Sequence, residues 1–351
     1  MNFYSLFKHI AFQSDPEFVH DQTINLMSKF PIGAKLFQHP YPCDKKYECN
    51  VGQLKWSFPI GLAAGLDKNG KCLPFFAQLL FGAIEVGTVT PKPQSGNEKP
   101  RLFRYVNEAS LRNSMGFNND GAEKLLKNIE LYKMSNYFQK PIGVNLGKNQ
   151  VTPLEDTHKD YQFLYHYFAH IADYLVINIS SPNTTNLRSF QNIDLLEKLL
   201  ASLDSVREKA PKPLFLKVAP DLEESEIESI VSVVSKYKLA GIIATNTTKI
   251  EAMGAGGVSG KLLKQKATLV RKTILHYLKK HPNLAFIGTG GVDSFDELLD
   301  FWKLGGDAMQ IYTSFIYQGP ELLMQFKYEI DKTLNKYNVK NVNELIQKLH
   351  S

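Results

Sequence analysis

The sequence predicts an α/β fold, namely a (β/α)8 TIM barrel preceded by a short N-terminal extension of two helices. Three observations support this fold class. Short apolar, β-branched runs alternate with longer amphipathic stretches along the 351 residues, which is the pattern of β-α units and a parallel sheet. There are eight such runs, the number that a closed barrel requires. Each run is followed by polar or glycine-rich residues, where the active sites of barrels lie.

The elements follow in order along the chain. Two helices are expected first, because Phe3, Tyr4, Leu6, Phe7, Ile10 and Phe12 form one apolar cluster and Asp15-Pro16 can begin a second helix that carries Phe18, Val19, Ile24, Leu26, Met27 and Phe30. The eight strands are expected at Pro59–Ala64, Ala83–Val89, Pro141–Leu146, Tyr174–Ile179, Pro213–Val218, Gly241–Thr245, Ala285–Gly288 and Ala308–Tyr312. Between them, Asp194–Lys209 and Glu224–Lys238 have the apolar stripes of amphipathic helices. We expect a helical extension over residues 1–40 and a barrel over residues 41–351.

Composition restricts the function classes. A hydrophobic content of 43% allows a large core, and a mild charge of +6 without a basic block does not favour nucleic-acid binding. Cys43, Cys49 and Cys72 form no CxxC pair, so neither a disulfide framework nor a zinc ribbon is expected. No apolar run approaches the roughly 20 residues of a transmembrane helix, and no signal or transit peptide is recognised. We therefore expect a cytoplasmic protein, either free or attached to a membrane surface.

A cluster of hydrogen-bonding side chains follows the fourth strand. Asn178, Ser180, Ser181, Asn183 and Thr184 supply two amides and three hydroxyls. Taken alone, the cluster fits a turn as well as it fits an active site. The other strand ends carry Gly65-Leu66-Asp67-Lys68, Gly87-Thr88, Asn145, Lys217, Thr245-Asn246-Thr247, Gly288-Thr289-Gly290-Gly291 and Tyr312-Thr313. Because all eight strand ends are polar or glycine-rich, a site distributed over the barrel is the better interpretation.

Some of these residues indicate the kind of ligand. Gly290-Gly291 and Thr313 follow the last two strands, where barrels often bind phosphate. Gly254–Gly260 is expected to be a glycine-rich loop, and its spacing is not that of a dinucleotide fingerprint. Lys217 lies inside an apolar run and needs a partner there. A carboxylate, a phosphate or the electron-rich edge of a cofactor would provide one.

Five long segments carry a resemblance to a known family. They are Gly61–Lys68, Glu85–Pro91, Lys99–Arg104, Asn113–Asn119 and Asn178–Thr184. These segments resemble the signatures of the class 2, quinone-dependent dihydroorotate dehydrogenases, and the match runs from the first helix to about Pro320. The resemblance implies an FMN-containing barrel that oxidises dihydroorotate to orotate in pyrimidine (UMP) biosynthesis and passes the electrons to a membrane quinone.

The resemblance also implies the roles of individual residues. It assigns FMN to Ala64, Gly65, Leu66, Asp67, Lys68, Thr88, Asn145, Asn178, Lys217 and Thr245, with the phosphate near Gly260, Gly291, Tyr312 and Thr313. It assigns the substrate to Lys68, Asn113, Ser114, Met115, Gly116, Phe117, Asn178, Asn183, Asn246 and Thr247. An ammonium matches the carboxylate of orotate, and carboxamides match its alternating N–H and C=O groups. Lys217 would stabilise the negative charge of the reduced flavin.

Ser181 is similar to the catalytic base of this family, which removes a proton from C5 while a hydride leaves C6 for flavin N5. Serine is a poor base and needs help from water, from a hydroxyl such as that of Thr184, or from nearby cations. Class 1 relatives carry cysteine at this position, so Ser181 supports class 2. Thr185-Asn186 replaces a Pro-Gly pair that is common in relatives, which bears on the mobility of this loop.

The N-terminal helices are expected either to pack on the barrel or, as the resemblance implies, to form a quinone tunnel and a membrane-facing surface. Residues 1–40 contain three lysines and three acidic residues, so docking would be mostly hydrophobic. His20 and Arg104 match positions that line the quinone pocket of the family, and Tyr312 is a third candidate. A peripheral monomer on the cytoplasmic side of a bacterial inner membrane is expected.

Two other functions stay open. Lys217 could form a Schiff base in a lyase or aldolase barrel, and the N-terminal helices could be the functional part of a non-catalytic membrane-docking protein. His166 and His170, four residues apart, could hold a metal ion, but no carboxylate motif accompanies them and no metal is expected.

Overall fold

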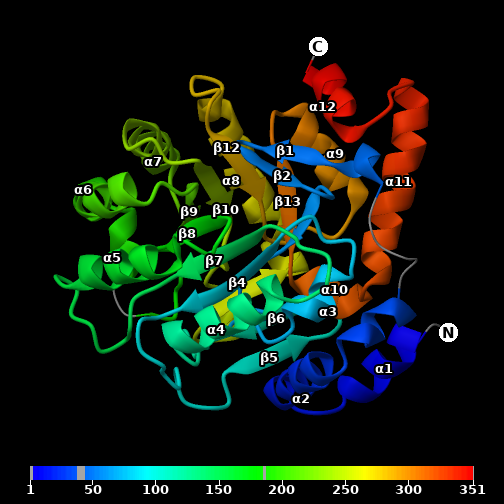
Figure 1. The fold of residues 1–351 in the computed structure, drawn as a ribbon, viewed down its shortest axis with the longest axis horizontal. Coiled ribbons are helices and arrows are strands. Elements are labelled where there is room, and N and C mark those ends of the chain that lie inside the picture. The colour runs from blue at the N-terminus through cyan, green and yellow to red at the C-terminus, as the bar shows by residue number, and fades with distance from the viewer. Residues whose placement is uncertain (1–2, 38–43, 185–186, 351) are drawn as a thin grey trace.

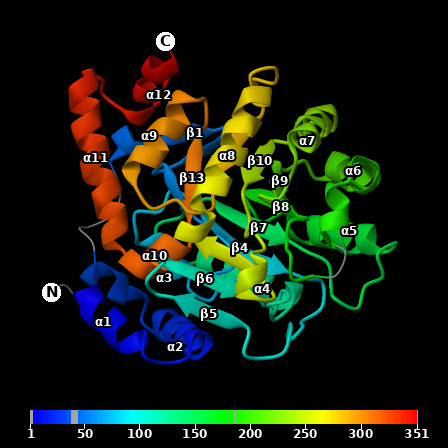
Figure 2. The ribbon, with the colours of Figure 1, turned by 180° about the vertical axis from the view of Figure 1, so that it is seen from behind.

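The computed structural model describes residues 3–37, 44–184 and 187–350, which Figures 1 and 2 show from opposite sides. The predicted barrel is confirmed, since eight parallel strands close in the order β10-β12-β13-β3-β4-β7-β8-β9. These strands are β3 (Ile60–Leu62), β4 (Ile84–Val89), β7 (Ile142–Leu146), β8 (Tyr174–Asn178), β9 (Leu214–Val218), β10 (Gly241–Ala244), β12 (Ala285–Gly288) and β13 (Ala308–Ile311). Every bound lies within two residues of the prediction.

The barrel strands form where apolar runs can be buried on both faces. Every residue of β7, β8 and β9 is buried, because one face of each strand points into the barrel and the other packs under helices. The barrel closes where β13 pairs with β3, with Met309 opposite Ile60. Closure brings the carboxyl ends of all the strands to one end of the molecule.

Helices surround the strands (Figure 1). They are α3 (Leu73–Ala77), α4 (Ala122–Lys133), α5 (Thr157–Phe168), α6 (Ile193–Lys209), α7 (Glu224–Lys236), α8 (Lys261–Leu278), α9 (Phe295–Lys303) and α10 (Thr313–Gln318), followed by α11 (Glu321–Tyr337) and α12 (Val342–His350). The short 3-10 helices η3 (Leu187–Gln191) and η4 (Glu251–Met253) lie in connections. The two helices predicted from apolar stripes are confirmed as α6 and α7, whose leucine, isoleucine and valine stripes are buried.

A hairpin covers the end of the barrel where the strands begin. The 3-10 helix η2 (Lys45–Tyr47) leads into β1 (Cys49–Val51) and β2 (Leu54–Trp56), which pair antiparallel. Trp56 is fully buried there. Its ring lies so close to Gly61 that a Cβ on Gly61 would come within 2.7 Å of it. This hairpin was not predicted from the sequence, because each of its strands has only three residues.

A second small sheet lies at the other end of the barrel, where the strands end. It contains β5 (Leu102–Tyr105), β6 (Ser110–Asn113) and β11 (Gly257–Gly260) in the order β11-β6-β5. The prediction of a glycine-rich loop over Gly254–Gly260 is therefore wrong for its last four residues, which pair antiparallel with β6. Glycine is a weak strand former, and only the distant partner β6 makes this segment a strand.

The predicted N-terminal helices are confirmed as α1 (Phe3–Ala11) and α2 (Pro16–Lys29), followed by the 3-10 helix η1 (Pro31–Leu36). Asp15 caps α2, since its side chain accepts a hydrogen bond from the backbone N–H of Phe18 at 2.8 Å. In Figure 1, α1 and α2 lie beside α10 and β5. The α2 carboxylate of Glu17 pairs with Arg101, and the two side chains are almost fully buried.

The N-terminal helices also expose several large apolar side chains. These are Leu6, Phe7, Ile10, Phe18, Leu26, Phe30, Ile32 and Leu36. Packing on the barrel therefore accounts for only part of the apolar surface of this extension. None of the helices within the described residues is long and apolar enough to cross a membrane.

Candidate functional site

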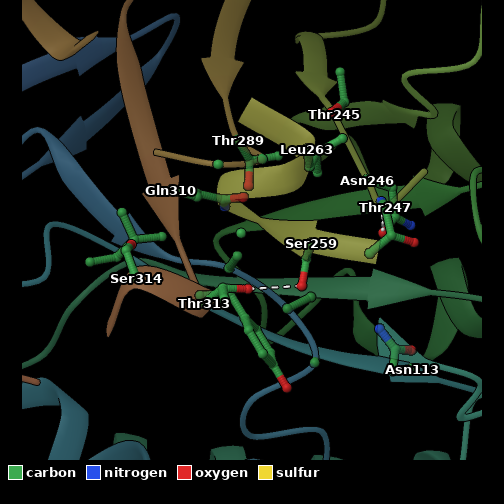
Figure 3. Close-up of a pocket in the computed structure, with 18 of the residues that line it drawn as sticks. Asn113, Thr245, Asn246, Thr247, Ser259, Leu263, Thr289, Gln310, Thr313 and Ser314 are labelled. Atoms are coloured by element: carbon green, nitrogen blue, oxygen red, sulfur yellow. Dashed lines mark hydrogen bonds between the residues drawn. The ribbon is translucent and has the colours of Figure 1, made fainter. Parts of the chain in front are cut away.

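The carboxyl ends of the strands surround a cavity of about 540 Å³. Twenty of the side chains or backbones predicted from the sequence line it: His20, Ala64, Gly65, Lys68, Thr88, Asn113, Met115, Gly116, Phe117, Asn178, Ser181, Asn183, Lys217, Thr245, Asn246, Thr247, Gly260, Gly291, Tyr312 and Thr313. Figure 3 shows Asn246 and Thr247 on one side of the pocket and Thr313 on the other. Barrel closure thus brings together residues that are far apart in the chain.

A buried ionic group forms the floor of the cavity. The Nζ of Lys217 lies 3.0 Å from Oε1 of Glu85, which explains how a lysine is tolerated inside an apolar strand. The same carboxylate accepts hydrogen bonds from Asn145 Nδ2 at 2.8 Å and from Gln310 Nε2 at 2.7 Å. Asn145 is thus part of the floor and does not line the cavity.

Hydrogen bonds continue from this floor toward the loop that follows β8 and carries Ser180 and Ser181, called the serine loop below. Oδ1 of Asn145 accepts from Thr88 Oγ1 at 2.6 Å and from Asn178 Nδ2 at 3.0 Å. Oδ1 of Asn178 accepts from Ser180 Oγ at 2.8 Å, and Ser180 Oγ accepts from Asn246 Nδ2 at 3.0 Å. The strand ends of β4, β7, β8 and β10 are therefore joined by one polar network.

Ser181 is buried and lines the cavity. Its Oγ accepts a hydrogen bond from the backbone N–H of Asn183 at 3.2 Å. Nδ2 of Asn183 in turn donates to both oxygens of Asn113 at 3.1 Å, so the serine loop is tied to β6. Thr184 Oγ1 is buried without a hydrogen-bond partner among the described residues. The hydroxyl of Thr184 is therefore not bonded to Ser181.

Glycines and hydroxyls form the part of the cavity near α10. Gly260 and Gly291 have φ values of 88° and 74°, which other residues rarely adopt. A Cβ at Gly291 would lie 2.5 Å from Cα of Lys264. Thr313 Oγ1 donates to Ser259 Oγ at 2.9 Å, as drawn in Figure 3. Glycine at position 291 therefore allows this loop to pack against the start of α8.

Lys68 lines the main cavity and also a second, more polar cavity of about 370 Å³. Leu66 and Asp67 line this second cavity and not the main one. Burial, together with the charge of Arg101, lowers the pKa of Lys68 to about 8. Its ammonium has no hydrogen-bond or ion-pair partner within the described part of the chain, so an anionic ligand would find it available.

The three candidates for a quinone pocket lie in different surroundings. His20 lines both cavities, and burial together with the charge of Lys68 lowers its pKa to about 3. Burial raises the pKa of Tyr312 to about 12, so both side chains are neutral near pH 7. Arg104 does not line the main cavity. Its guanidinium donates to the carbonyl oxygens of Phe12 and Ser14 at 3.1 and 3.0 Å, which ties β5 to the turn between α1 and α2.

Ser114 also lies outside the lining of the main cavity. Its carbonyl oxygen accepts a hydrogen bond from Asn97 Nδ2 at 3.0 Å, and its backbone N–H donates to the carbonyl oxygen of Arg101 at 2.8 Å. Ser114 therefore supports the neighbouring residues Met115 and Gly116, which do line the cavity.

Three residues that shape the site were not predicted from the sequence. Glu85 and Gln310 occupy the floor, and Arg188 donates to the carbonyl oxygens of Ser180 and Thr247. A signal existed for Glu85, because it is a charged residue inside the apolar strand Ile84–Val89, as Lys217 is in its own strand. Gln310 is likewise a polar residue inside the apolar strand Ala308–Ile311. No comparable signal exists for Arg188, because two of its partners, Asp221 and Thr247, lie 33 and 59 positions away.

Three buried polar atoms on the cavity wall have no hydrogen-bond partner among the described residues. They are Thr245 Oγ1, Gln310 Oε1 and Ser314 Oγ. Unpaired buried polar atoms are rare in native proteins. A large polar ligand that reaches from Gln310 to Ser314 would satisfy all three.

The remaining candidates lie elsewhere. Cys49 and Cys72 are buried free thiols, whereas Cys43 and Thr185-Asn186 lie outside the described residues. His166 belongs to α5 and His170 follows its end, and both are exposed. The described residues contain no group of three or more side chains that could hold a metal ion.

Comparisons with known proteins agree with this geometry. The family model described as Dihydroorotate dehydrogenase matches residues 47–334. A protein named Dihydroorotate dehydrogenase (quinone) from Idiomarina loihiensis is 41% identical over 91% of this chain and 98% of its own length. One of the same name from Nitratiruptor sp. is 39% identical over 98% of both chains. A crystal structure of DHODH from Eimeria tenella in complex with ferulenol has a TM-score of 0.84 at 32% identity, covering 95% of each chain.

Proposed function

Because the chain belongs to the family of quinone-dependent dihydroorotate dehydrogenases, we propose that it oxidises (S)-dihydroorotate to orotate with FMN in the main cavity and Ser181 as the catalytic base. The family consists of flavin-dependent oxidoreductases of pyrimidine biosynthesis that use a quinone as electron acceptor. The single observation that carries the proposal is that one cavity is lined by Ser181, by the unpaired ammonium of Lys68 and by the buried ammonium of Lys217.

The residues present fit FMN. Thr245 Oγ1 and Gln310 Oε1 are buried and unpaired on the wall that Lys217 shares, and polar ring atoms of a flavin would pair with them. Gly260, Gly291, Thr313 and Ser314 would hold the phosphate, because all four line the cavity and supply backbone N–H groups and hydroxyls. When bound, FMN would supply the hydride acceptor for dihydroorotate oxidation.

The side chains of this protein would bind the substrate and take up its proton. Lys68 would pair with the carboxylate of dihydroorotate, and the amides of Asn113, Asn183 and Asn246 would pair with its ring N–H and C=O groups. Oγ of Ser181 would accept the proton from C5 while its own hydroxyl proton passes to solvent water. The backbone N–H of Asn183, 3.2 Å from that oxygen, would stabilise the partial negative charge that Oγ gains as its hydroxyl proton leaves.

The N-terminal extension would deliver the quinone. Exposed apolar side chains on α1 and α2, such as Leu6, Ile10 and Phe18, support attachment to a membrane surface. His20 lines the main cavity from α2, so a quinone bound there would approach the FMN. We propose peripheral attachment of a monomer on the cytoplasmic side of the inner membrane, with residues 1–40 as a unit separate from the barrel 41–351.

Anaerobic mixing with dihydroorotate tests the central reaction. We expect the purified protein to be yellow and its flavin absorbance to be bleached by dihydroorotate. In Ser181→Ala the flavin content should be unchanged while bleaching slows by about a hundredfold or more, because general base catalysis contributes that much. Wild-type protein without flavin absorbance would refute the FMN assignment, and unchanged bleaching in Ser181→Ala would refute the assignment of the base.

The control variant is Ser202→Ala. Ser202 lies on α6, where its hydroxyl donates to the carbonyl oxygen of Leu199 at 2.6 Å, outside the cavity lining. It should bleach at the wild-type rate. Turnover with a ubiquinone analogue should exceed turnover with fumarate or NAD, since the latter two are acceptors of class 1 relatives.

A further inference from the structure

Glu85 is a fully buried carboxylate beneath the cavity, with 0% of its surface exposed. Within the described part of the chain, its hydrogen-bond partners are all donors: Lys217 Nζ at 3.0 Å, Asn145 Nδ2 at 2.8 Å and Gln310 Nε2 at 2.7 Å. The orientation of the Asn145 amide is fixed, because its Oδ1 accepts from Thr88 and Asn178. Both oxygens of Glu85 therefore act as hydrogen-bond acceptors for N–H donors.

Lys217 therefore has a counterion inside the protein. Among the described residues, Glu85 is the only hydrogen-bond partner of its ammonium, which has three N–H donors. Lys217 also lines the cavity, so its other donors are left for a ligand there. The carboxylate lies behind the ammonium and offsets part of its charge.

The same carboxylate determines how the neighbouring amides point. Because Glu85 accepts from Nδ2 of Asn145, Oδ1 of Asn145 must face Thr88 and Asn178. Nδ2 of Asn178 is then used as the donor, which leaves its Oδ1 to accept from Ser180. Glu85 thus fixes donors and acceptors along a network that reaches the residue next to Ser181.

We propose that Glu85 is a positioning residue that sets the charge which Lys217 presents to FMN, and thereby the redox potential of the bound cofactor. This inference rests on the proposed function for the presence of FMN. A full positive charge beside the flavin favours the reduced form, since that form carries the negative charge. Glu85 weakens this preference, which keeps the reduced cofactor able to pass its electrons to the quinone.

Glu85→Gln is the decisive variant. It removes the charge with little change of shape, and Gln310 can adapt because turning its amide would bring the unpaired Oε1 toward the new Gln N–H. The midpoint potential of bound FMN would be measured by spectroelectrochemical titration, which needs neither dihydroorotate nor quinone. We expect the reduced form to gain about tenfold in relative affinity, a rise of about 30 mV for a two-electron couple.

The matched control is Asp307→Asn. Asp307 is a partly buried carboxylate before the start of β13, at the opposite end of the barrel, where it accepts from the backbone N–H of Phe286 at 2.6 Å. This variant makes the same change in net charge, and its FMN potential should equal that of the wild type. A rise in Asp307→Asn as large as in Glu85→Gln would show a general charge effect and overturn the proposal, as would an unchanged potential in Glu85→Gln.

A double variant covers the case in which Glu85→Gln does not fold or hold FMN. Glu85→Gln with Lys217→Gln removes both charges, and replacing a whole buried pair is tolerated better than breaking it. If Glu85 offsets Lys217, the potential should change by less than about 30 mV. A fall larger than that would mean that Lys217 acts with its full charge, which contradicts the proposal. Failure of the proposed function would show instead in the wild type, as missing flavin or missing bleaching.

Discussion

Arg188 donates from Nε to the carbonyl oxygen of Ser180 at 3.1 Å. A second nitrogen of the same guanidinium donates to the carbonyl oxygen of Thr247 at 2.8 Å, and a third lies 2.7 Å from Asp221. One planar side chain therefore joins the peptide before Ser181 to the strand end that carries Asn246 and Thr247. Lysine, with a single nitrogen at its tip, cannot reproduce this geometry.

We predict that Arg188→Lys slows flavin reduction by dihydroorotate about tenfold or more, because small displacements of reacting groups have large effects on rate. Reoxidation of the flavin by a quinone should keep its wild-type rate, since Arg188 contacts only the serine loop and its neighbours. Stopped-flow measurement of the two half-reactions separates these effects. Lys266→Met is the control, because Lys266 also pairs with Asp221 but contacts neither Ser180 nor Thr247. Equal slowing of both half-reactions would contradict this role.

Lys68 should give substrate binding a characteristic pH dependence. Burial and the charge of Arg101 lower its pKa to about 8, so the ammonium is present below pH 8 and is lost as the pH rises through that value. The kcat/KM for dihydroorotate, an anion, should therefore fall by up to about tenfold per pH unit above pH 8, while kcat at saturating substrate changes less. Lys68→Met should have a low kcat/KM that does not fall further above pH 8. If the same fall persists in the variant, it is caused by the titration of another group.

The buried pair of Glu17 and Arg101 should hold α2 on the barrel. Oε1 of Glu17 lies 2.8 Å from a guanidinium nitrogen of Arg101 and 3.1 Å from Nζ of Lys99. Glu17→Gln should lower the free energy of unfolding by on the order of 2 kcal/mol, since charged hydrogen bonds are lost in a buried place. Chemical denaturation measures this loss. The neighbouring Glu98→Gln, at an exposed position, should change stability by less than about 0.5 kcal/mol.

The difference in free energy of unfolding between the wild type and Glu17→Gln should disappear in acid. Burial by itself would raise the pKa of Glu17, but hydrogen bonds from Arg101 and Lys99 outweigh it and hold the pKa below its ordinary 4.5. The stabilising contribution is therefore complete above pH 4.5 and is lost as the pH falls through the lower pKa of the folded state. Wild type and Glu17→Gln should approach the same stability there. A constant difference down to the acid limit would show that the charge of Glu17 is not its cause.

Membrane attachment should depend on the apolar side chains of α1. Ile10 is 63% exposed on α1 and Leu269 is 66% exposed on α8. Ile10→Ser should weaken co-sedimentation with phospholipid vesicles about tenfold, because one buried aliphatic side chain contributes that much, whereas Leu269→Ser should have no effect. Raising the salt concentration should not release the protein, since the charges of residues 1–40 balance. Equal loss in both variants, or release by salt, would exclude this mode of attachment.

The sequence by itself determined the barrel and the ends of its strands that carry the chemistry. Alternation of short β-branched runs with amphipathic stretches is a local property, so all eight barrel strands were predicted to within two residues. The polar residues of a motif such as Asn178–Thr184 are adjacent in the sequence, so the motif can be recognised without knowledge of the fold. The hairpin β1–β2 and the strand β11 were missed, because short or glycine-rich segments become strands only through their partners.

Tertiary structure alone decided which residues meet. Glu85 and Lys217 are 132 positions apart, and Glu85 and Gln310 are 225 apart. The sequence indicated that Lys217 needs a partner, but it could not choose between a carboxylate, a phosphate and a cofactor. Closure of the barrel made that choice, because the register of β4, β9 and β13 turns these side chains toward one interior point. Polar residues at strand ends are a local signal, whereas their pairing depends on the geometry of the whole sheet.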